Sequence, residues 1–281
     1  MKHITDLNRE RNTQIVEQAK EINELLLANN ITPIFLKGTG NLLEKLYEDV
    51  AERMVGDIDI LIQKSDCEKA YMLLIDYGYF NDIALQKDHR HLPRLIHKSK
   101  IGAIEVHKEI LRGKYAKHFN YQHVDNTLTD NNKIKTLSNG NKIKLTIYSR
   151  LINDYEYRLK KINLRAAYDY YLISNKSTHQ IKLVEPTLKK ELDAGLEIYN
   201  YILAKPRNIN FSSTIKSKRF LNDCLNKLNK SKISRIKSFF NKMIVSNSIR
   251  IDRAPMYVVT TSIQARKFNP FFALLLFETK R

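Results

Sequence analysis

The sequence predicts an α+β protein, in which a short mixed β-sheet flanked by helices is followed by a mainly helical C-terminal domain. Short apolar runs punctuated by glycines alternate with helical patterns in the first half of the chain. Beyond Thr146 the sequence shows long helical patterns, with apolar residues every three or four positions, at 149–174, 186–204 and 214–246. We therefore place a domain boundary there, with an α+β domain at 1–146 and a basic, mainly helical domain at 147–281.

The elements of the first domain follow from hydrophobic periodicity and from turn residues. In chain order they are a helix at 8–29, a strand at 31–36 that Gly38 breaks, a helix from Gly40 to about Glu48 capped by Thr39, a strand at 57–62, a helix from Ser65 or Asp66 through Leu74 that closes at Gly78, and a strand at 101–110. The dipeptide Asn139-Gly140, flanked by KIKTL and KIKLT, predicts a β-hairpin.

Length and composition indicate a folded protein with a buried core. The chain has 281 residues, of which 43% are hydrophobic. Its two cysteines, Cys67 and Cys224, lie far apart, which argues against a disulfide framework and favours a reducing, cytoplasmic location. The N-terminus lacks the apolar stretch of a secretion signal, and the longest apolar run, at 271–277, is shorter than the roughly 20 residues of a membrane span. We expect no transmembrane segment and interpret that run as a buried strand or helix.

Positive charge is concentrated in the last third of the chain. The net charge is +18, and the stretch from Lys205 to Arg281 holds 17 Lys and Arg residues against three acids. Such a segment is typical of proteins that bind a polyanion, and RNA is the partner it favours. Two alternatives stay open, namely an ordinary solvated surface and, for the basic amphipathic pattern that begins at Phe220, an anionic membrane surface.

Three carboxylates are the candidate catalytic and metal-binding residues. Asp57 and Asp59 are two apart in a predicted strand, so both side chains point to one side of it. Oxygen ligands at that spacing suit Mg²⁺ or Mn²⁺, and Glu105 on a second strand is the natural third ligand of a two-metal site. The alternatives are a solvated edge-strand face and a surface glutamate. Because crowded carboxylates repel, neutralising one aspartate should raise the melting temperature of the metal-free protein.

A glycine turn lies upstream of the aspartates. The change from strand to helix at Leu36–Gly40 predicts a phosphate cradle. Lys37 and Arg53 either pair with phosphate charge or are surface cations. His107, on the Glu105 face, is a candidate contact to nucleotide or acceptor.

Three further histidines, His89, His91 and His97, have ligand-like spacing. Zinc usually takes thiolate or clustered acidic support and no cysteine is near, so packed or exposed histidines are the favoured interpretation.

These motifs resemble a known group of enzymes. The segments LKG, LY, ER, GDIDIL, GY, HRH and EVHKE, within residues 31–112, are similar to those of a bacterial family of uncharacterised nucleotidyltransferases in the polymerase-β superfamily. More distantly they resemble nucleotidyltransferase toxins of abortive-infection systems. LRAAYDYYLI at 164–173 is a weaker echo, with an Arg and an Asp one helical turn apart. This chain has Gly38-Thr39 where the superfamily usually has Gly-Gly or Gly-Ser.

The resemblance implies that Gly38 and Thr39 hold a triphosphate, that Asp57 and Asp59 bind both metals and that Glu105 completes the site. The implied reaction moves a nucleoside monophosphate from a nucleoside triphosphate to an acceptor hydroxyl. The basic last third of the chain makes RNA, such as a tRNA end, the leading acceptor. One alternative is nucleotidylation of a small molecule, a sugar or a protein. Another is a catalytically silent RNA-binding or toxin-neutralising protein of the same fold. The sequence names no protein partner.

Overall fold

The computed structural model describes residues 2–81, 89–184 and 186–229. The chain divides into two compact units, Met1–Lys227 and Leu228–Arg281, and nearly all described residues belong to the first. Thr146 lies inside a helix, α5 (Asn139–Tyr148), within that first unit. The division into a catalytic domain and a basic helical domain stays a prediction.

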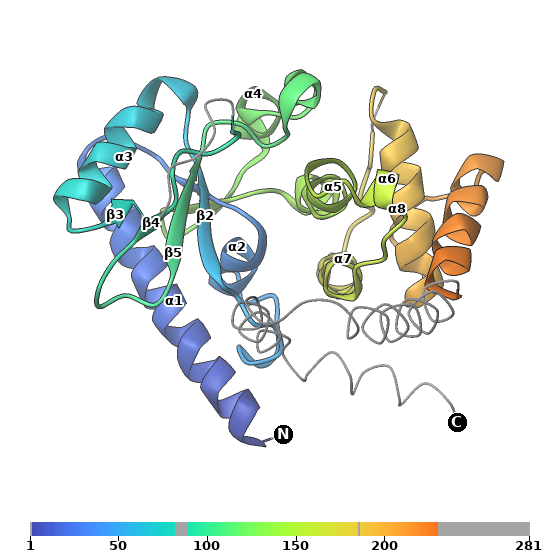
Figure 1. Ribbon diagram of the computed structural model, residues 1–281, viewed down its shortest axis with the longest axis horizontal. Coiled ribbons are helices and arrows are strands. Elements are labelled where there is room, and N and C mark those ends of the chain that lie inside the picture. The colour runs from blue at the N-terminus through green and yellow to red at the C-terminus, as the bar shows by residue number, and fades with distance from the viewer. Residues whose placement is uncertain (1, 82–88, 185, 230–281) are drawn as a thin grey trace, which may run out of the picture. The chain divides into compact units, whose positions relative to one another are not determined.

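The first unit contains a seven-stranded mixed sheet, with α5, α7 (Leu164–Lys176) and α8 (Lys189–Ile202) to one side of it (Figure 1), and the strand order is β3-β4-β5-β2-β1-β7-β6. Its strands are β1 (Ile34–Phe35), β2 (Asp57–Leu61), β3 (Phe80–Asn81), β4 (Leu95–Ile96), β5 (Ala103–His107), β6 (Thr129–Asn131) and β7 (Ile134–Thr136). The β2–β5 and β1–β7 pairs are parallel, whereas β1–β2, β3–β4, β4–β5 and β6–β7 are antiparallel. The predicted α+β class is confirmed.

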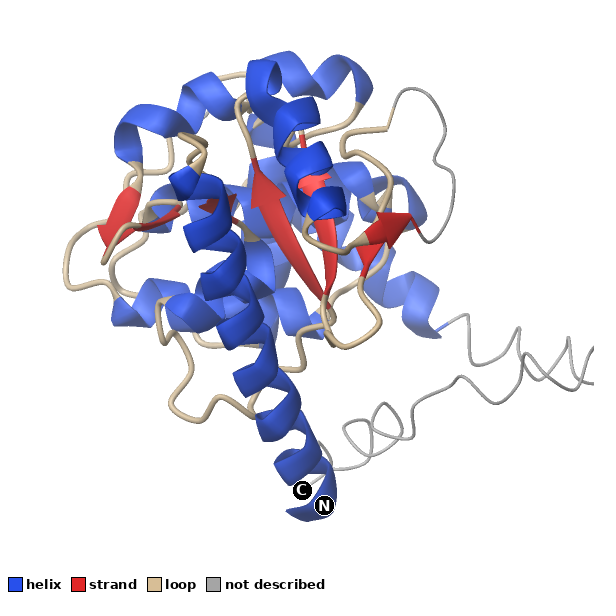
Figure 2. Ribbon diagram, turned by 90° about the vertical axis from the view of Figure 1, so that its left-hand side faces the viewer, coloured by secondary structure: helices blue, strands red, loops and turns tan. Residues whose placement is uncertain are grey.

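Helices cover this sheet and continue beyond it. They are α1 (Lys2–Ala28), α2 (Lys37–Leu43), α3 (Cys67–Asp76), α4 (Tyr121–Val124), α5, α6 (Glu156–Leu159), α7 (Leu164–Lys176) and α8 (Lys189–Ile202), with short 3-10 turns at Lys64–Asp66, Gly113–His118 and Asp125–Thr127. The long α1 runs across one face of the sheet (Figure 2), and the residues that predicted it, including Ile15, Ala19 and Ile22, are buried. Gly78 ends the α3 segment with a φ of 101°, as the turn signal predicted.

The predicted helices of the second half form with interruptions. The pattern at 149–174 is divided into a π-helical turn (Ser149–Asn153), α6 and α7, because Tyr155 and Lys160 adopt left-handed φ angles of 56° and 48°. Helices α5, α7 and α8 lie close together (Figure 1), and their inward residues belong to the hydrophobic core. A further helix covers 215–229. The rest of the predicted 214–246 helix and the apolar run at 271–277 lie outside the described residues.

The hairpin predicted at Asn139-Gly140 is wrong. The β6–β7 hairpin turns at Asn132 and Lys133, whose φ angles of 52° and 64° fit a tight two-residue turn. Asn139 instead begins α5, on which Ile143 and Ile147 are buried. Burial of this helical face outweighs the local turn preference of Asn-Gly, because several buried side chains contribute more free energy than one turn.

The predicted N-cap at Thr39 is also wrong. Helix α2 begins two residues earlier, at Lys37, and Leu36 occupies the N-cap position without a side-chain hydrogen bond. Gly40 is needed inside α2, since a Cβ there would lie 2.6 Å from the Phe35 carbonyl oxygen.

Both cysteines are buried and unpaired, as expected. No helix among the described residues has the length and apolar character needed to cross a membrane.

Candidate active site

The three predicted carboxylates meet on two neighbouring strands. Strands β2 and β5 are parallel, with Asp59 directly opposite Glu105 and Asp57 opposite Ala103. Adjacent strands lie about 4.8 Å apart, so the side chains of paired residues on one face are neighbours. The intervening residues Ile58 and Ile104 are fully buried, as alternation along each strand requires.

Asp59 is the most tightly held of the three. Its side chain is 3% exposed, and its Oδ1 accepts from Lys37 Nζ at 2.5 Å and lies 2.7 Å from His107 Nε2. Burial alone would raise the pKa of Asp59, but the Lys37 charge and the His107 hydrogen bond outweigh burial and lower it. Lys37 has a left-handed φ of 49°, an uncommon conformation for a lysine, at the junction of β1 and α2. Asp59 is therefore ionised and already attracts a cation.

Asp57 and Glu105 differ from Asp59 in their surroundings. Asp57 is half-buried, and among the described residues no hydrogen bond reaches its carboxylate. Burial and the charge of Asp59 raise the pKa of Asp57. Burial also acts to raise the pKa of Glu105, yet the hydrogen bond from His107 lowers it overall. Asp57 is thus the carboxylate left available for a ligand, whereas Asp59 and Glu105 are oriented by their neighbours.

The glycine turn lies against a buried arginine. A Cβ on Gly38 would lie 2.3 Å from Arg53 Nη1, so a larger residue there would displace that guanidinium from its present position. Arg53 Nε donates to Asp169 Oδ2 at 2.9 Å, and Tyr47 OH donates to Asp169 Oδ1 at 2.8 Å. Thr39 is fully buried, and its hydroxyl donates to the Asp57 carbonyl oxygen at 2.7 Å. The Thr39 hydroxyl therefore ties α2 to β2, which leaves its backbone as the part that can face a ligand.

Sequence reasoning did not assign roles to four residues near this site. Asp169 and Tyr47 hold Arg53, and Arg94 and Arg165 are close enough for their charges to act on Asp57. Arg165 and Asp169 lie in LRAAYDYYLI, the segment that weakly resembles a family motif. That resemblance was the sequence feature that could have identified both residues. Nothing in the sequence distinguishes Arg94 from other cations.

Histidines surround Glu105. His91 Nε2 and His107 Nε2 lie 3.5 and 3.4 Å from Glu105 Oε2, and the His89 ring contacts the His91 ring edge to face, with centroids 4.0 Å apart. Burial lowers the pKa of His91 to about 4 and also lowers the pKa of His89. His97 instead packs against Tyr79, with ring centroids 5.0 Å apart. The structure thus brings His89 and His91 to the site and leaves His97 away from it.

This donor set fits a divalent metal ion. One ligand atom each from Asp59, Glu105 and His107 lies within 4.8 Å of the other two, and all three residues are buried or partly buried. The position of Lys37 Nζ beside Asp59 shows that positive charge is favoured there. Carboxylate oxygens suit Mg²⁺ and Mn²⁺, so these residues could hold either ion. The group contains two of the three predicted metal ligands, together with His107, and Asp57 as a ligand stays a prediction.

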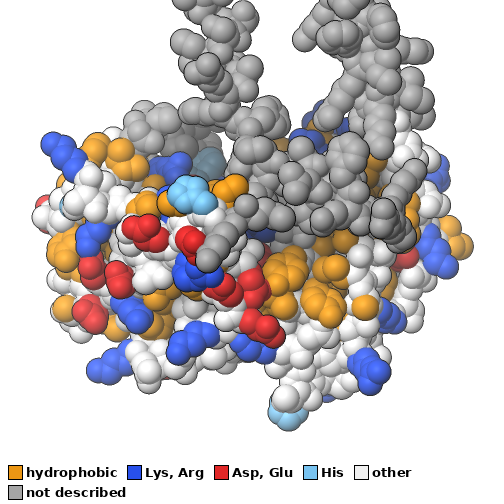
Figure 3. All heavy atoms as spheres, turned by 90° about the horizontal axis from the view of Figure 1, so that it is seen from below, with side chains coloured by type: hydrophobic (Ala, Val, Ile, Leu, Met, Phe, Trp, Pro, Cys, Tyr) orange, Lys and Arg blue, Asp and Glu red, His pale blue; other side chains and the backbone are white. Residues whose placement is uncertain are grey.

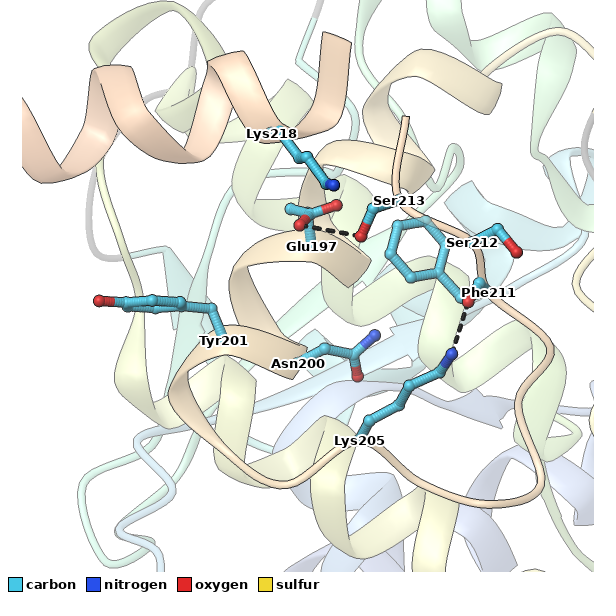
Figure 4. A pocket seen from close by; sticks show the side chains of 8 residues that line it. All are labelled: Glu197, Asn200, Tyr201, Lys205, Phe211, Ser212, Ser213 and Lys218. Atoms are coloured by element: carbon cyan, nitrogen blue, oxygen red, sulfur yellow. Dashed lines mark hydrogen bonds between the residues drawn. The ribbon is translucent and has the colours of Figure 1, made fainter. Parts of the chain in front are cut away.

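A separate hollow lies on α8 and the segment after it (Figure 4), with a volume of about 550 Å³. Several of its polar groups bond to one another: Ser213 Oγ donates to Glu197 Oε1 at 3.1 Å, and Lys205 Nζ donates to the Phe211 carbonyl oxygen at 2.6 Å. None of the three candidate carboxylates lines it. We therefore assign the site to β2 and β5.

Carboxylates on adjacent parallel strands, beside a glycine turn with a lysine and an arginine, are what an enzyme that handles polyphosphates with divalent ions requires. The class this defines is a transferase of phosphorus-containing groups. A family profile described as "Uncharacterised nucleotidyltransferase" matches residues 1–192, and the chain belongs to that family. It is therefore a nucleotidyltransferase, and the resemblance to a family of uncharacterised nucleotidyltransferases is confirmed over a longer stretch than the motifs covered. No curated protein and no solved structure matches the chain.

Proposed function

We propose that this protein transfers a nucleoside monophosphate from a nucleoside triphosphate to an acceptor hydroxyl, with Asp57, Asp59 and Glu105 as its metal-binding catalytic residues. The observation that carries the proposal is the parallel register of β2 and β5, which puts Asp59 beside Glu105 and leaves Asp57 two residues away on the same strand. Membership of a nucleotidyltransferase family supports a nucleoside triphosphate as substrate.

The proposed roles follow from the different surroundings of the carboxylates. Bound divalent ions would help to ionise the attacking hydroxyl and would neutralise charge on the leaving phosphates. Asp59 and Glu105, oriented by Lys37 and His107, hold fixed negative charge in a buried place. Asp57 is half-buried with no described hydrogen-bond partner, so its carboxylate can turn to a ligand without breaking a contact.

Cations next to these carboxylates are our proposed triphosphate contacts. Lys37 and Arg53 flank Gly38, and Arg53 uses only its Nε for the bond to Asp169 among the described hydrogen bonds. Its terminal nitrogens can therefore donate to phosphate oxygens, a bidentate geometry that arginine favours. Gly38 leaves room for the Arg53 guanidinium beside these carboxylates, and Gly38 and Thr39 would themselves contact phosphate through their backbone N–H groups.

RNA is our proposed acceptor because the last third of the chain is basic. Of its 17 cations, eleven lie at 230–281, outside the described residues. On the described part of the face shown in Figure 3, Asp and Glu side chains lie among Lys and Arg side chains, so that part is not uniformly basic. The proposal therefore rests on the C-terminal composition, and a small molecule, a sugar or a protein remains the alternative acceptor.

The test of the proposed function is to follow radiolabel from each of the four nucleoside triphosphates, labelled in the α-phosphate, in the presence of Mg²⁺ or Mn²⁺ and total RNA. We expect label on RNA and release of pyrophosphate. Label on small acceptors or on protein would move the acceptor to the alternative class. Absence of transfer to RNA, protein and a panel of small acceptors would contradict nucleotidyl transfer.

We expect triphosphate binding to depend on a divalent ion. Metal-bound carboxylates bridge the protein to phosphate oxygens, so removing the ion leaves two groups of like charge facing one another. Calorimetric titration of a triphosphate should show affinity at least about 10-fold weaker in excess chelator, since a loss of about 1.4 kcal/mol of binding free energy already corresponds to a factor of ten. Unchanged affinity in chelator would contradict the metal site.

Binding of RNA should depend strongly on salt. If the basic C-terminal third contacts phosphates, the logarithm of affinity falls linearly with the logarithm of salt concentration, with a slope of about −0.7 for each phosphate neutralised on a single strand. Fluorescence anisotropy with a labelled single-stranded RNA measures this slope, which we expect to reach several units. A flat response would assign these lysines and arginines to an ordinary solvated surface.

A further inference from the structure

The imidazole side chains of His91 and His107 lie beside the candidate carboxylates, although a Mg²⁺ site needs only oxygen ligands. His91 forms an isolated β-bridge with His107, and both side chains are almost completely buried, at 7% and 1% exposure. The Nε2 atom of each faces Glu105 Oε2, and that of His107 also faces Asp59 Oδ1. Burying two imidazoles beside two acids removes polar groups from water, which calls for a compensating interaction.

The hydrogen bond of His91 defines which of its nitrogens carries the proton. His91 Nδ1 lies 2.7 Å from the Leu92 carbonyl oxygen, and a carbonyl can only accept, so Nδ1 is the protonated nitrogen. In the neutral ring the Nε2 lone pair then faces a carboxylate oxygen 3.5 Å away. Two acceptors that face one another in a buried place are stabilised by a cation between them. A backbone carbonyl that holds the far nitrogen is also the usual support of a metal-bound histidine.

His107 can present a lone pair to the same place if a metal ion replaces the Nε2 proton that it donates to Asp59. Its Nδ1 is buried and has no hydrogen-bond partner among the described residues. No donor to Nδ1 therefore holds the ring in the tautomer that carries its proton on Nε2, the nitrogen facing Asp59. Its Nε2 is one of the three ligand atoms that lie within 4.8 Å of one another. A metal ion there would meet nitrogen as well as oxygen.

We infer that His107 and His91 add imidazole nitrogens to the carboxylate site, so that it binds a divalent transition ion such as Mn²⁺ in preference to Mg²⁺. The inference rests on the proposed function, since it concerns the same metal site. Mg²⁺ strongly prefers oxygen ligands and gives up water reluctantly, whereas imidazole favours first-row transition ions. The acids that would share the metal ion with these histidines lie on β2 and β5. The spacing of histidines within DHRHLPRLIH therefore could not reveal the site.

The test uses Mn²⁺ alone with the full chain and reads the ligand atoms directly. Electron paramagnetic resonance titration gives Mn²⁺ affinity, and its pulsed form detects coupling to a ligand ¹⁴N nucleus. We expect nitrogen coupling in the wild-type protein. His107→Gln and His91→Gln should each weaken Mn²⁺ binding by about 10-fold or more, with less effect on Mg²⁺ measured by competition. His97→Gln, a histidine packed on Tyr79 away from the site, is the matched control and should keep the wild-type spectrum.

The outcomes separate this inference from the proposed function. Mn²⁺ that binds through Asp59 without nitrogen coupling, or coupling that survives both site variants, would overturn the inference and leave a carboxylate-only metal site. Failure of both Mn²⁺ and Mg²⁺ to bind, with or without a triphosphate, would overturn the proposed function too. If a histidine variant does not fold, the wild-type spectrum alone decides whether nitrogen is a ligand.

Discussion

Replacement of Asp59 by asparagine should lower nucleotidyl transfer by about 100- to 1,000-fold, since charge stabilisation at a metal site supplies several kcal/mol and each 1.4 kcal/mol is a factor of ten in rate. The substitution keeps the side-chain shape while removing the charge that Lys37 and His107 now hold. Steady-state transfer of label to the acceptor measures the loss. Asp57→Asn and Glu105→Gln should be impaired in the same assay.

Glu109→Gln is the matched carboxylate control. Glu109 follows β5, carries the same charge as Glu105 and pairs only loosely with Lys64, at 3.7 Å. We expect its transfer rate to stay near that of the wild type. Full activity of Asp59→Asn, in a protein that melts normally, would remove Asp59 from the catalytic residues and with it the proposed two-metal site.

The two aspartate variants, Asp57→Asn and Asp59→Asn, should differ in stability, which the sequence alone did not predict. Crowding of carboxylates suggested that neutralising either aspartate raises the melting temperature, and the structure supports this only for Asp57. The pKa of Asp59 is lowered in the folded state, so its charge stabilises the fold above the unfolded pKa of about 4, and this stabilisation is lost as the pH falls. The pKa of Asp57 is raised, so its charge opposes folding at neutral pH.

In chelator at pH 7, Asp57→Asn should therefore melt above the wild type and Asp59→Asn below it. The loss for Asp59→Asn should be about 1–3 kcal/mol, the usual effect of leaving a buried donor without its partner. Differential scanning calorimetry compares the two directly. Equal shifts in the same direction would show that Lys37 and His107 do not hold Asp59 as the structure describes.

Breaking the Arg53–Asp169 pair should have the largest effect on folding. Both side chains are mostly buried, at 11% and 7% exposure, and the pair joins the loop after α2 to helix α7. Asp169→Leu leaves a buried arginine without a counter-charge, which commonly costs about 3–5 kcal/mol. Adding Arg53→Met should recover much of that loss, because an apolar pair of similar volume is often as stable as a buried ion pair. Urea unfolding measures both.

Asp154→Ala provides the comparison for a surface ion pair. Asp154 pairs with Arg150 one helical turn away, at 42% exposure, and such pairs contribute about 0.3–0.5 kcal/mol. A loss for Asp169→Leu no larger than that for Asp154→Ala would mean that Arg53 reaches solvent without its partner. The double variant should fold yet bind triphosphate weakly, which separates the support of the fold from the proposed phosphate contact.

Local signals were sufficient for most elements of residues 1–146 because these elements are strongly periodic. The helix before the sheet, the strand with two aspartates and the acidic strand that follows all form, as α1, β2 and β5, although α1 begins earlier and β5 is shorter than predicted. Alternation along β2 and β5 also predicted which side chains share a face. Where prediction failed, at Asn139-Gly140 and Thr39, a local preference competed with burial of a helix, and burial is a property of the whole fold.

The sequence by itself determined the class of fold, the two acidic strands and the residue types of the proposed metal site, because each of these depends on patterns within a few residues. Only the tertiary structure decided that Asp59 and Glu105 are directly opposite in a parallel pair, since strand order depends on contacts far apart in the chain. It also brought Asp169 to Arg53 and His91 to Glu105. The residues in these contacts are far apart in the sequence, so no local pattern predicts that they meet. The charges that surround each residue are therefore known only from the folded structure.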